Sequence, residues 1–384
     1  MNFDDINASQ LQTRSGVKWS HYPSDILPAW VADMDFLVSE PIQKALQDAA
    51  GKSDLGYPVS EQTTSLPDLF TDRVKVRYDW AIESRHVKMI NDVVQGLYVS
   101  VLNYTSPGDK IIVQTPIYPP FLQMLTETGR LLAANPLKIT ASGYEIDFEH
   151  LERLIDKKTK MLAFCNPHNP TGRAFRRSDL ETLADICNRH NLLVVSDEIH
   201  SDLVLDGSVH VPLASISDEI ASRTTTLMSA SKSFNIAGLC MAFAHFGSDE
   251  LRARFSRIPS HVLGGTNALS IAAVKAAWTQ SDDWLHSVKK QLSANRQRVY
   301  DFSVANWPGV TFFPPEATYL AWFDMRRFDL SASPKEHFLK YGGVALNDGA
   351  DFGKEGIGFV RMNFATSSEI LNSILDRMDK ALRV

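Results

Sequence analysis

The chain of 384 residues is 44% apolar and 22% charged, with a formal net charge of −6. This is the composition of a globular protein, and the length predicts two domains within one enzyme-sized protein. The negative charge and the lack of a long Lys/Arg run argue against a nucleic-acid partner, and no apolar stretch is long enough for a membrane span. The acidic N-terminus is unlike a secretory signal, and three scattered cysteines suit a reducing compartment, so we expect a cytoplasmic protein.

The first predicted helix follows the segment "LPAWVADMDF" (27–36). Ser39 can cap this helix, Pro41 suits its first turn and Gly51 can end it. The tripeptide "GYP" (56–58) has the composition of a turn.

From about Val87 onward, short apolar runs alternate with helix-length amphipathic stretches such as "PPFLQMLTETG" and "SDLETLADICNRHN". Apolar strands that alternate with helices indicate a mostly parallel sheet buried on both faces. The strand candidates are "KIIVQTP" (110–116), "KMLAFCNP" (160–167), "NLLVVSDE" (191–198), "TTLMSAS" (225–231) and "CMAFAHFG" (240–247).

A long helical pattern over 272–299 is expected to lead into a C-terminal α+β domain. Its predicted strands are "VTFF" (310–313), "TYLAWF" (318–323) and "GFVRMNFA" (358–365). We therefore divide the chain into a large domain over 45–280 and a smaller one formed by 1–44 together with 281–384.

Three of the predicted strands end in polar, turn-rich segments: Asn166 to Gly172, Asp197 to His200, and Ser229 to Lys232. Ligands of open parallel sheets bind at the carboxyl ends of the strands, so these segments are expected to form one site. Taken singly, Asp197 would more often be a helix cap or an ion-pair partner, and Lys232 a surface amine.

Together, Lys232, Asp197 and Asn169 are the groups that pyridoxal 5′-phosphate requires. The lysine would bind the cofactor aldehyde, the aspartate would keep the ring nitrogen protonated, and the asparagine would donate to the ring hydroxyl. A lysine in a desolvated pocket has the lowered pKa that this chemistry needs. Hydroxyl and backbone N–H groups suit the phosphate, and the candidates are Ser229, Ser231, Gln95, Gly96 and Leu97.

The segments "NPHNPTG", "SDEIHSDL" and "SASKSFNIAGL", in this order, resemble the class I/II aminotransferase superfamily, fold type I of the pyridoxal-phosphate enzymes. The spacing from Asn169 to Asp197 to Lys232 is similar to that of the family. The resemblance implies an α/β fold, in which a mostly parallel, seven-stranded sheet lies between helices and a smaller α+β domain is attached.

The resemblance also implies roles for three more residues. Tyr118 falls where an aromatic ring stacks on the cofactor, and Arg361 falls where the family binds the substrate α-carboxylate. Tyr57 falls where a tyrosine of one subunit reaches the cofactor phosphate of the other, which implies a homodimer with shared active sites. Ordinary core or turn positions are the alternatives for both tyrosines.

Further substrate-binding candidates are less specific. Ala32 and Asp33, beside Trp30, lie on the segment that in this family closes over the substrate. His200 can line the pocket, and Asn347 lies in a turn-rich stretch at the expected substrate entrance.

One position departs from the pattern of many relatives, in which an arginine eight residues after the lysine grips the phosphate. Here that position is Cys240. The phosphate must then be bound by hydroxyls, backbone N–H groups, Tyr57 or another basic residue.

The segments "WVADMDF", "DEIHSDL", "KSFNIAGL" and "EATYLAWFD" are most similar to the carbon–sulfur β-lyase branch, the cystathionine β-lyase-like enzymes. The function expected from this resemblance is cleavage of cystathionine or a related cysteine S-conjugate, an amino-acid substrate, to thiol, pyruvate and ammonia. An aminotransferase, or a regulator that keeps the cofactor site and binds a protein partner, stays open as an alternative. A metal enzyme or a nicotinamide enzyme is disfavoured, because neither HExxH nor G-x-G-x-x-G occurs.

Overall fold

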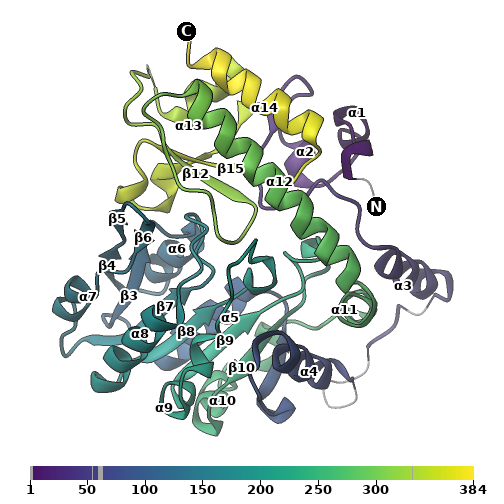
Figure 1. Cartoon of the computed structure of the whole chain (residues 1–384). Helices are drawn as coiled ribbons and strands as arrows, with labels where there is room; N and C mark the ends of the chain where they lie inside the picture. The colour runs from purple at the N-terminus through teal and green to yellow at the C-terminus, as the bar shows by residue number, and fades with distance from the viewer. Residues whose placement is uncertain (1–2, 54, 59–63, 331) are drawn as a thin grey trace.

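A computed structural model describes residues 3–53, 55–58, 64–330 and 332–384. The larger part of the molecule is an α/β unit, drawn in blue to teal in Figure 1. The smaller part combines the C-terminal residues, in green to yellow, with the purple N-terminal segment. The long helix α12 (Asp282–Asn306) runs from the larger part into the smaller one.

The large unit contains a seven-stranded sheet in the order β2-β10-β9-β8-β7-β3-β4. Strand β10 is antiparallel to both of its neighbours, and the other neighbouring pairs are parallel, which confirms the predicted mostly parallel sheet. The bounds are β2 (Val87–Ile90), β3 (Lys110–Thr115), β4 (Leu131–Pro136), β7 (Thr159–Cys165), β8 (Leu193–Asp197), β9 (Thr224–Met228) and β10 (Ala242–Phe246).

The five strands proposed from sequence all occur, but the two edge strands β2 and β4 were not among them. Edge strands are less apolar than central ones, which weakens their signal. In β4 the sequence is "LLAANP", and both leucines are exposed. Strand β2 has only four residues, one of them Lys88.

Alternate strand residues face opposite layers of helices, as a sheet buried on both faces requires. Ala163 and Val195 pack with one layer, whereas Leu162 and Val194 pack with the other. The first layer comprises α5 (Val93–Tyr104), α6 (Pro119–Glu127) and α10 (Asp249–Phe255). The second comprises α7 (Phe148–Arg153), α8 (Arg177–Arg189) and α9 (Asp218–Ser222).

The smaller part contains a four-stranded antiparallel sheet in the order β11-β12-β15-β14, as expected for an α+β domain. Its strands are β11 (Thr311–Phe312), β12 (Leu320–Asp324), β14 (Asn347–Asp348) and β15 (Phe359–Asn363). The N-terminal segment joins it through β1 (Leu27–Pro28), which pairs with β13 (Val344–Ala345). The helices here are α1 (Ala8–Leu11), α2 (Val17–Ser20), α13 (Pro334–His337) and α14 (Ser368–Ala381).

The remaining elements are the hairpin of β5 (Lys138–Thr140) and β6 (Gly143–Glu145), and helices α3 (Glu40–Gly51) and α4 (Leu66–Tyr78). Helix α3 begins and ends as the sequence indicated, because the Ser39 hydroxyl accepts the Ile42 N–H and Gly51 is the last helical residue. The division of the chain at 44/45 falls inside this helix, and the domain boundaries stay a prediction.

The helical pattern over 272–299 does lead into the C-terminal part, as expected, but it is divided between two helices. It comprises the end of α11 (Ala268–Gln280) and the beginning of α12, with Ser281 between them. The buried Ser281 hydroxyl donates to the carbonyl of Ala276 at 3.1 Å and bonds the Ser39 hydroxyl at 2.7 Å. A serine that bonds the preceding turn competes with the helical backbone, which accounts for the break.

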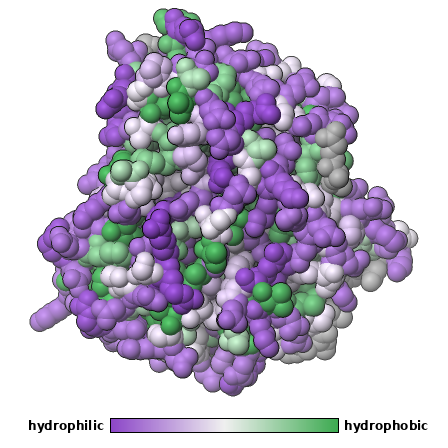
Figure 2. Space-filling model, viewed as in Figure 1, coloured by the Kyte–Doolittle hydropathy of each residue, from purple (hydrophilic) through white to green (hydrophobic). Residues whose placement is uncertain are grey.

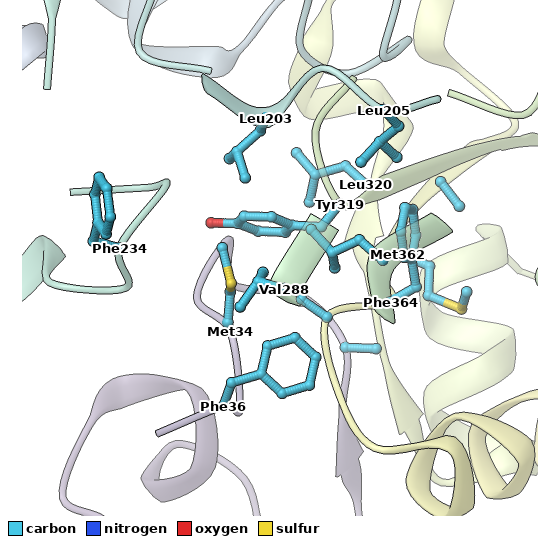
Figure 3. Close-up of a cluster of buried hydrophobic side chains, with 14 of the residues drawn as sticks. Met34, Phe36, Leu203, Leu205, Phe234, Val288, Tyr319, Leu320, Met362 and Phe364 are labelled. Carbon is cyan, nitrogen blue, oxygen red and sulfur yellow. The ribbon is translucent and has the colours of Figure 1, made fainter. Parts of the chain in front are cut away.

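A single apolar core joins the N-terminal segment, α12 and the C-terminal sheet. Figure 3 shows Phe36, Val288, Tyr319 and Phe364 in this cluster, with the hydroxyl of Tyr319 directed toward the side where Phe234 lies. Phe234 is two residues beyond Lys232. The core therefore fixes the lysine loop relative to both ends of the chain.

The outer surface is polar where Figure 2 displays it, with apolar groups scattered between hydrophilic ones. Among the residues described, no helix has the length and apolar character needed to cross a bilayer.

Gly172 gives a test of how closely the two parts of the molecule approach. Its φ is +69°, and a Cβ there would lie 2.2 Å from Cβ of Pro315. Gly172→Ala is expected to lower the free energy of unfolding by about 2–4 kcal/mol, measured by urea denaturation.

Gly207→Ala is the matched control, because its φ is +74° but no atom lies within 4 Å of the added Cβ. It should cost only about 1 kcal/mol. Equal losses for both variants would contradict the close approach at Gly172.

Candidate active site

A cavity of about 360 Å³ lies at the carboxyl ends of the parallel strands, between the two parts of the molecule. Nine of the residues proposed from sequence line it. They are Ala32, Tyr118, Asn169, Asp197, His200, Ser231, Lys232, Asn347 and Arg361. The three strand-end segments singled out from the sequence therefore do converge on one site.

Lys232 reaches the cavity from the loop that follows β9. The Ser229 hydroxyl shapes this loop, since it donates to the carbonyl of Met241 at 2.6 Å and accepts the Ser231 N–H at 2.9 Å. The Lys232 amine donates to the carbonyl of Ala32 at 2.9 Å. Burial lowers the pKa of this amine, and the nearby Arg361 charge lowers it further, while the carboxylate of Asp33 acts in the opposite direction.

Asp197 is the last residue of β8, and its carboxylate is buried. Within the described part of the chain its hydrogen-bond donor is the Ile199 N–H, at 3.0 Å. Burial raises the pKa of Asp197 to about 7, and the neighbouring charge of Glu198 adds to the shift. Among the described residues no cation is hydrogen-bonded to this carboxylate, although the nearby charge of Lys232 lowers its pKa against the effect of burial.

Arg361 lies on β15 and is only 4% exposed. Its guanidinium donates to the side-chain oxygens of Asn169 (3.0 Å) and Asn347 (2.7 Å) and to the carbonyl of Trp30 (3.1 Å). Burial lowers its pKa to about 10, but the group stays charged at neutral pH. A fixed, buried guanidinium of this kind suits a carboxylate ligand.

Asn169 and Tyr118 form one wall. The Tyr118 N–H donates to the carbonyl of Asn169 at 3.1 Å. Because the Asn169 side-chain oxygen accepts from Arg361, its amide nitrogen is the end left to donate into the cavity. Burial raises the pKa of Tyr118, so its hydroxyl is neutral at physiological pH.

His200 is buried against Tyr319, with the two ring centroids 6.1 Å apart. Burial lowers its pKa to about 3, so the imidazole is neutral in the folded chain. It lines the cavity as a polar but uncharged group.

Six of the proposed residues do not line the cavity. Gly96 and Leu97 are buried in the core, and the Gln95 side chain bonds the Asn91 N–H and the carbonyl of Leu263. The Ser229 hydroxyl bonds the carbonyl of Met241 within the lysine loop and does not line the cavity. Asp33 follows the lining residue Ala32 in sequence but is not itself a lining residue. Tyr57 is fully exposed on its own chain.

The part of α5 that lines the cavity comes before the proposed residues Gln95, Gly96 and Leu97. Asp92, Val93 and Val94 line the cavity, and the Asp92 carboxylate caps the helix by accepting the Gln95 N–H at 2.7 Å. An N-cap aspartate is the signal that could have located this turn. The other lining residues are Trp30, Val31, Cys165, Ile199 and Ala237, of which Trp30 lies on the segment considered from sequence.

The segment Trp30–Phe36, here called the strap, lacks regular secondary structure but is held through its backbone carbonyls. The carbonyl of Ala32 accepts from both Lys232 and the Tyr319 hydroxyl (2.8 Å). Asn363 donates to the carbonyls of Val31 (2.7 Å) and Asp33 (2.6 Å).

Asn235 ties the strap to the lysine loop. Its amide donates to the carbonyls of Met34 (3.0 Å) and Phe36 (2.9 Å), and its oxygen accepts the Met34 N–H (3.0 Å). Its φ of +57° is a conformation that asparagine tolerates better than most residues. The strap and Lys232 are therefore positioned together.

No group of three or more His, Cys, Asp or Glu side chains that could hold a metal ion occurs in the part of the chain that the structure describes. The polar groups of the cavity are instead an amine, a carboxylate, a guanidinium and amides.

Comparisons with known proteins agree with this arrangement. The family model for aminotransferase class I and II matches residues 31–378. The chain is 39% identical to the cystathionine β-lyase PatB of Bacillus subtilis, over the full length of both chains. Among solved structures, cystalysin from Treponema denticola, which contains a pyridoxal 5′-phosphate cofactor, superposes with a TM-score of 0.93 at 30% identity, over 100% of this chain and 98% of that one.

A second solved structure is the pyridoxal-phosphate-bound carbon–sulfur lyase from Staphylococcus hominis. It gives a TM-score of 0.92 at 30% identity and covers 100% of this chain and 99% of that one. The chain belongs to the class I and II aminotransferase family.

Asp197→Asn tests the cost of the buried carboxylate in the cofactor-free protein. Between about pH 4 and 7 Asp197 is protonated in the folded state but ionised in the unfolded one, so stability falls as pH rises through this window. The difference between about 7 and 3.8 corresponds to about 4 kcal/mol. The variant should match wild type near pH 4 and be more stable by up to that amount at pH 8.

Urea denaturation at several pH values measures this difference, with the exposed Asp301→Asn as control. A stability difference that does not change between pH 4 and 8 would show that Asp197 is not desolvated in the cofactor-free chain.

Asn235→Gly tests the link between the strap and the lysine loop. Glycine accepts the positive φ but removes three hydrogen bonds, a loss of about 1–3 kcal/mol in total. Amide hydrogen exchange within residues 30–36 should become faster. Asn191→Gly is the control, since Asn191 has a φ of +54° and its side chain bonds Arg223 away from the strap; equal effects on the strap would contradict the link.

Proposed function

We propose that this protein is a pyridoxal-phosphate-dependent carbon–sulfur β-lyase, which cleaves cystathionine or a related cysteine S-conjugate to thiol, pyruvate and ammonia. The observation that carries the proposal is that the Lys232 amine, the Asp197 carboxylate and the Arg361 guanidinium line one cavity. The family membership and the full-length similarity to a cystathionine β-lyase support the same reaction.

The residues fit the cofactor. The Asp197 carboxylate is buried without a cation in contact, which suits a protonated ring nitrogen. Tyr118 and Ile199 supply an aromatic and an aliphatic surface for the ring faces. The amide of Asn169 is oriented to donate to the ring hydroxyl.

The phosphate cannot be bound as in relatives with an arginine at position 240, because this chain has Cys240 there. Cys240 does not line the cavity, and its side chain is exposed. Among the described lining residues the cationic groups are Lys232 and Arg361, both committed elsewhere. We assign the phosphate to the first-turn N–H groups of α5 at Val93 and Val94, where a helix N-terminus favours an anion. The roles of Ser229 and Ser231 in binding it stay predictions.

Bound pyridoxal phosphate supplies an aldehyde that condenses with amines and a ring that withdraws electrons from the substrate Cα. Asp197 holds the proton at the ring nitrogen, and Arg361 binds the α-carboxylate and so orients the Cα–H bond. The Lys232 amine, with a pKa lowered by burial, is neutral in a larger fraction of molecules and takes the Cα proton. Where Cβ bears a thioether sulfur, loss of this proton leads to elimination: the Cβ–S bond breaks, the sulfur leaves as a thiolate with the electron pair of that bond, and the aminoacrylate that remains takes up water to give pyruvate and ammonia.

Two alternatives are kept. An aminotransferase would use the same residues but return the proton to the cofactor instead of losing a thiolate. A regulator of this fold would keep the cofactor site and bind a protein partner.

We further propose a cytoplasmic homodimer with shared active sites. Tyr57 does not line the cavity of its own chain, and its side chain is fully exposed. Such a position suits a tyrosine that reaches the phosphate of the second subunit. The exposed Leu55 beside it is an apolar residue that subunit contact would cover.

The proposal is tested on the full chain supplied with pyridoxal phosphate and L-cystathionine, by following thiol and pyruvate together with and without 2-oxoglutarate. Equal amounts of thiol and pyruvate without a keto acid are expected. Turnover that requires 2-oxoglutarate and yields glutamate would indicate an aminotransferase, and cofactor binding without turnover would favour the regulator.

Lys232→Ala is the matched control for this assay. It should remove the visible absorbance of the lysine-bound cofactor and the activity together, because the amine serves both. Activity that survives this change would contradict the proposed role of Lys232.

A further inference from the structure

A second, smaller cavity of about 160 Å³ adjoins the candidate active site. Ala237 lines both cavities, and Ala32 of the larger one is followed along the chain by Asp33 of the smaller one. The remaining walls come from the N-terminal arm around Arg14 to Trp19 and from the lysine loop at Asn235. The proposed mechanism uses none of the charged side chains in this smaller cavity.

Two of its charged groups neutralise each other. The Lys18 amine lies 2.9 Å from the Asp35 carboxylate, and the two side chains are only 6% and 2% exposed. The same amine donates to the carbonyl of Asp33 at 3.0 Å. This pair therefore fixes the arm to the strap and has little remaining capacity for a ligand.

The other two charged groups have no such partner. Within the described residues, neither the Arg14 guanidinium nor the Asp33 carboxylate makes a hydrogen bond or an ion pair. The cavity thus presents one cation and one anion that have no hydrogen-bonded or ion-paired partner among the described residues. This pair of charges is complementary to the carboxylate and the ammonium of a free α-amino acid.

The shared wall at Ala237 and the neighbouring residues Ala32 and Asp33 place the smaller cavity beside the proposed substrate position. Arg361 binds the α-carboxylate and Lys232 faces Cα in the proposed mechanism. Lys232 also contacts the carbonyl of Ala32, beside Asp33. Asp33 lies close enough for its carboxylate to raise the pKa of the Lys232 amine against the effect of burial. A substituent on Cβ that extends past Ala32 and Ala237 would enter the smaller cavity.

We propose that the smaller cavity binds the leaving half of the substrate and that this half is itself an α-amino acid, with Arg14 binding its carboxylate and Asp33 its ammonium. The preferred substrates are then thioethers of two amino acids rather than cysteine conjugates of apolar thiols. This inference rests on the proposed lyase function.

Three substrates distinguish the proposed contact of Arg14 with the distal carboxylate from that of Asp33 with the distal ammonium. L-Cystathionine carries both distal charges, S-(2-aminoethyl)-L-cysteine carries only the distal ammonium, and S-methyl-L-cysteine carries neither. On the cofactor-loaded full chain, Arg14→Gln should lower kcat/KM for cystathionine relative to the aminoethyl compound about 10–100-fold, mainly through KM. Asp33→Asn should lower both of these relative to S-methyl-L-cysteine by a similar factor.

Arg383→Gln is the control variant, because Arg383 is exposed and pairs with Asp379 near the C-terminus. It should leave all three ratios unchanged. A loss that is equal for the three substrates in Arg14→Gln, or no change in the ratios at all, would overturn the assignment.

Equilibrium binding keeps this inference separate from the lyase proposal. Calorimetry on cofactor-loaded Lys232→Ala needs no turnover, and adding Arg14→Gln should raise Kd for cystathionine about tenfold or more relative to S-methyl-L-cysteine. If wild type releases thiol from none of the probes but the Kd ratio shifts, the lyase proposal fails and the distal site stands. If thiol is released and the Kd ratio does not shift, the distal site fails alone.

Discussion

The candidate active site depends on the hydrogen bonds that the backbone carbonyls of one segment without secondary structure accept. Buried carbonyls must find donors, and the strap (Trp30–Phe36) finds them in Arg361, Lys232, Asn235 and Asn363. These donors come from the lysine loop and the C-terminal sheet, so the strap joins groups that are more than a hundred residues apart in sequence. The same hydrogen bonds that fold the strap also orient the amine and the guanidinium of the site.

The hydrogen bonds of the strap fix the positions of two charged groups that line the cavity. The carbonyls of the strap hold both the Lys232 amine and the Arg361 guanidinium at the wall of the cavity. The apolar core around Tyr319 and Phe364 prevents these elements from shifting independently (Figure 3). Preorganisation of this kind lowers the cost of orienting a substrate.

The central strands and the polar residues at their ends could be predicted from the sequence, because apolar runs and turn residues are local signals. Features that depend on contacts between segments far apart in the sequence could not be predicted in this way. The polar, short edge strands β2 and β4 depend on their neighbours, and the break at Ser281 depends on contacts with Ala276 and Ser39. Gln95, Gly96 and Leu97 were proposed to bind the phosphate, and only the fold shows that Asp92, Val93 and Val94 are the residues of this segment that line the cavity. The hydrogen bonds of Asn235 to the strap could not be predicted from the sequence either, since only the fold brings the two segments together.

Burial shifts the pKa values of Asp197 and Lys232 in opposite directions, but in both cases it disfavours the charged form. It raises the pKa of Asp197 and lowers that of Lys232, so burial favours the neutral form of both groups. A protonated ring nitrogen beside Asp197 would favour its ionised form, and an aldehyde bound to Lys232 would take the place of the proton on its amine. The two buried groups therefore match the two ends of the cofactor for the same physical reason, because each lacks the solvation that would otherwise stabilise its charge.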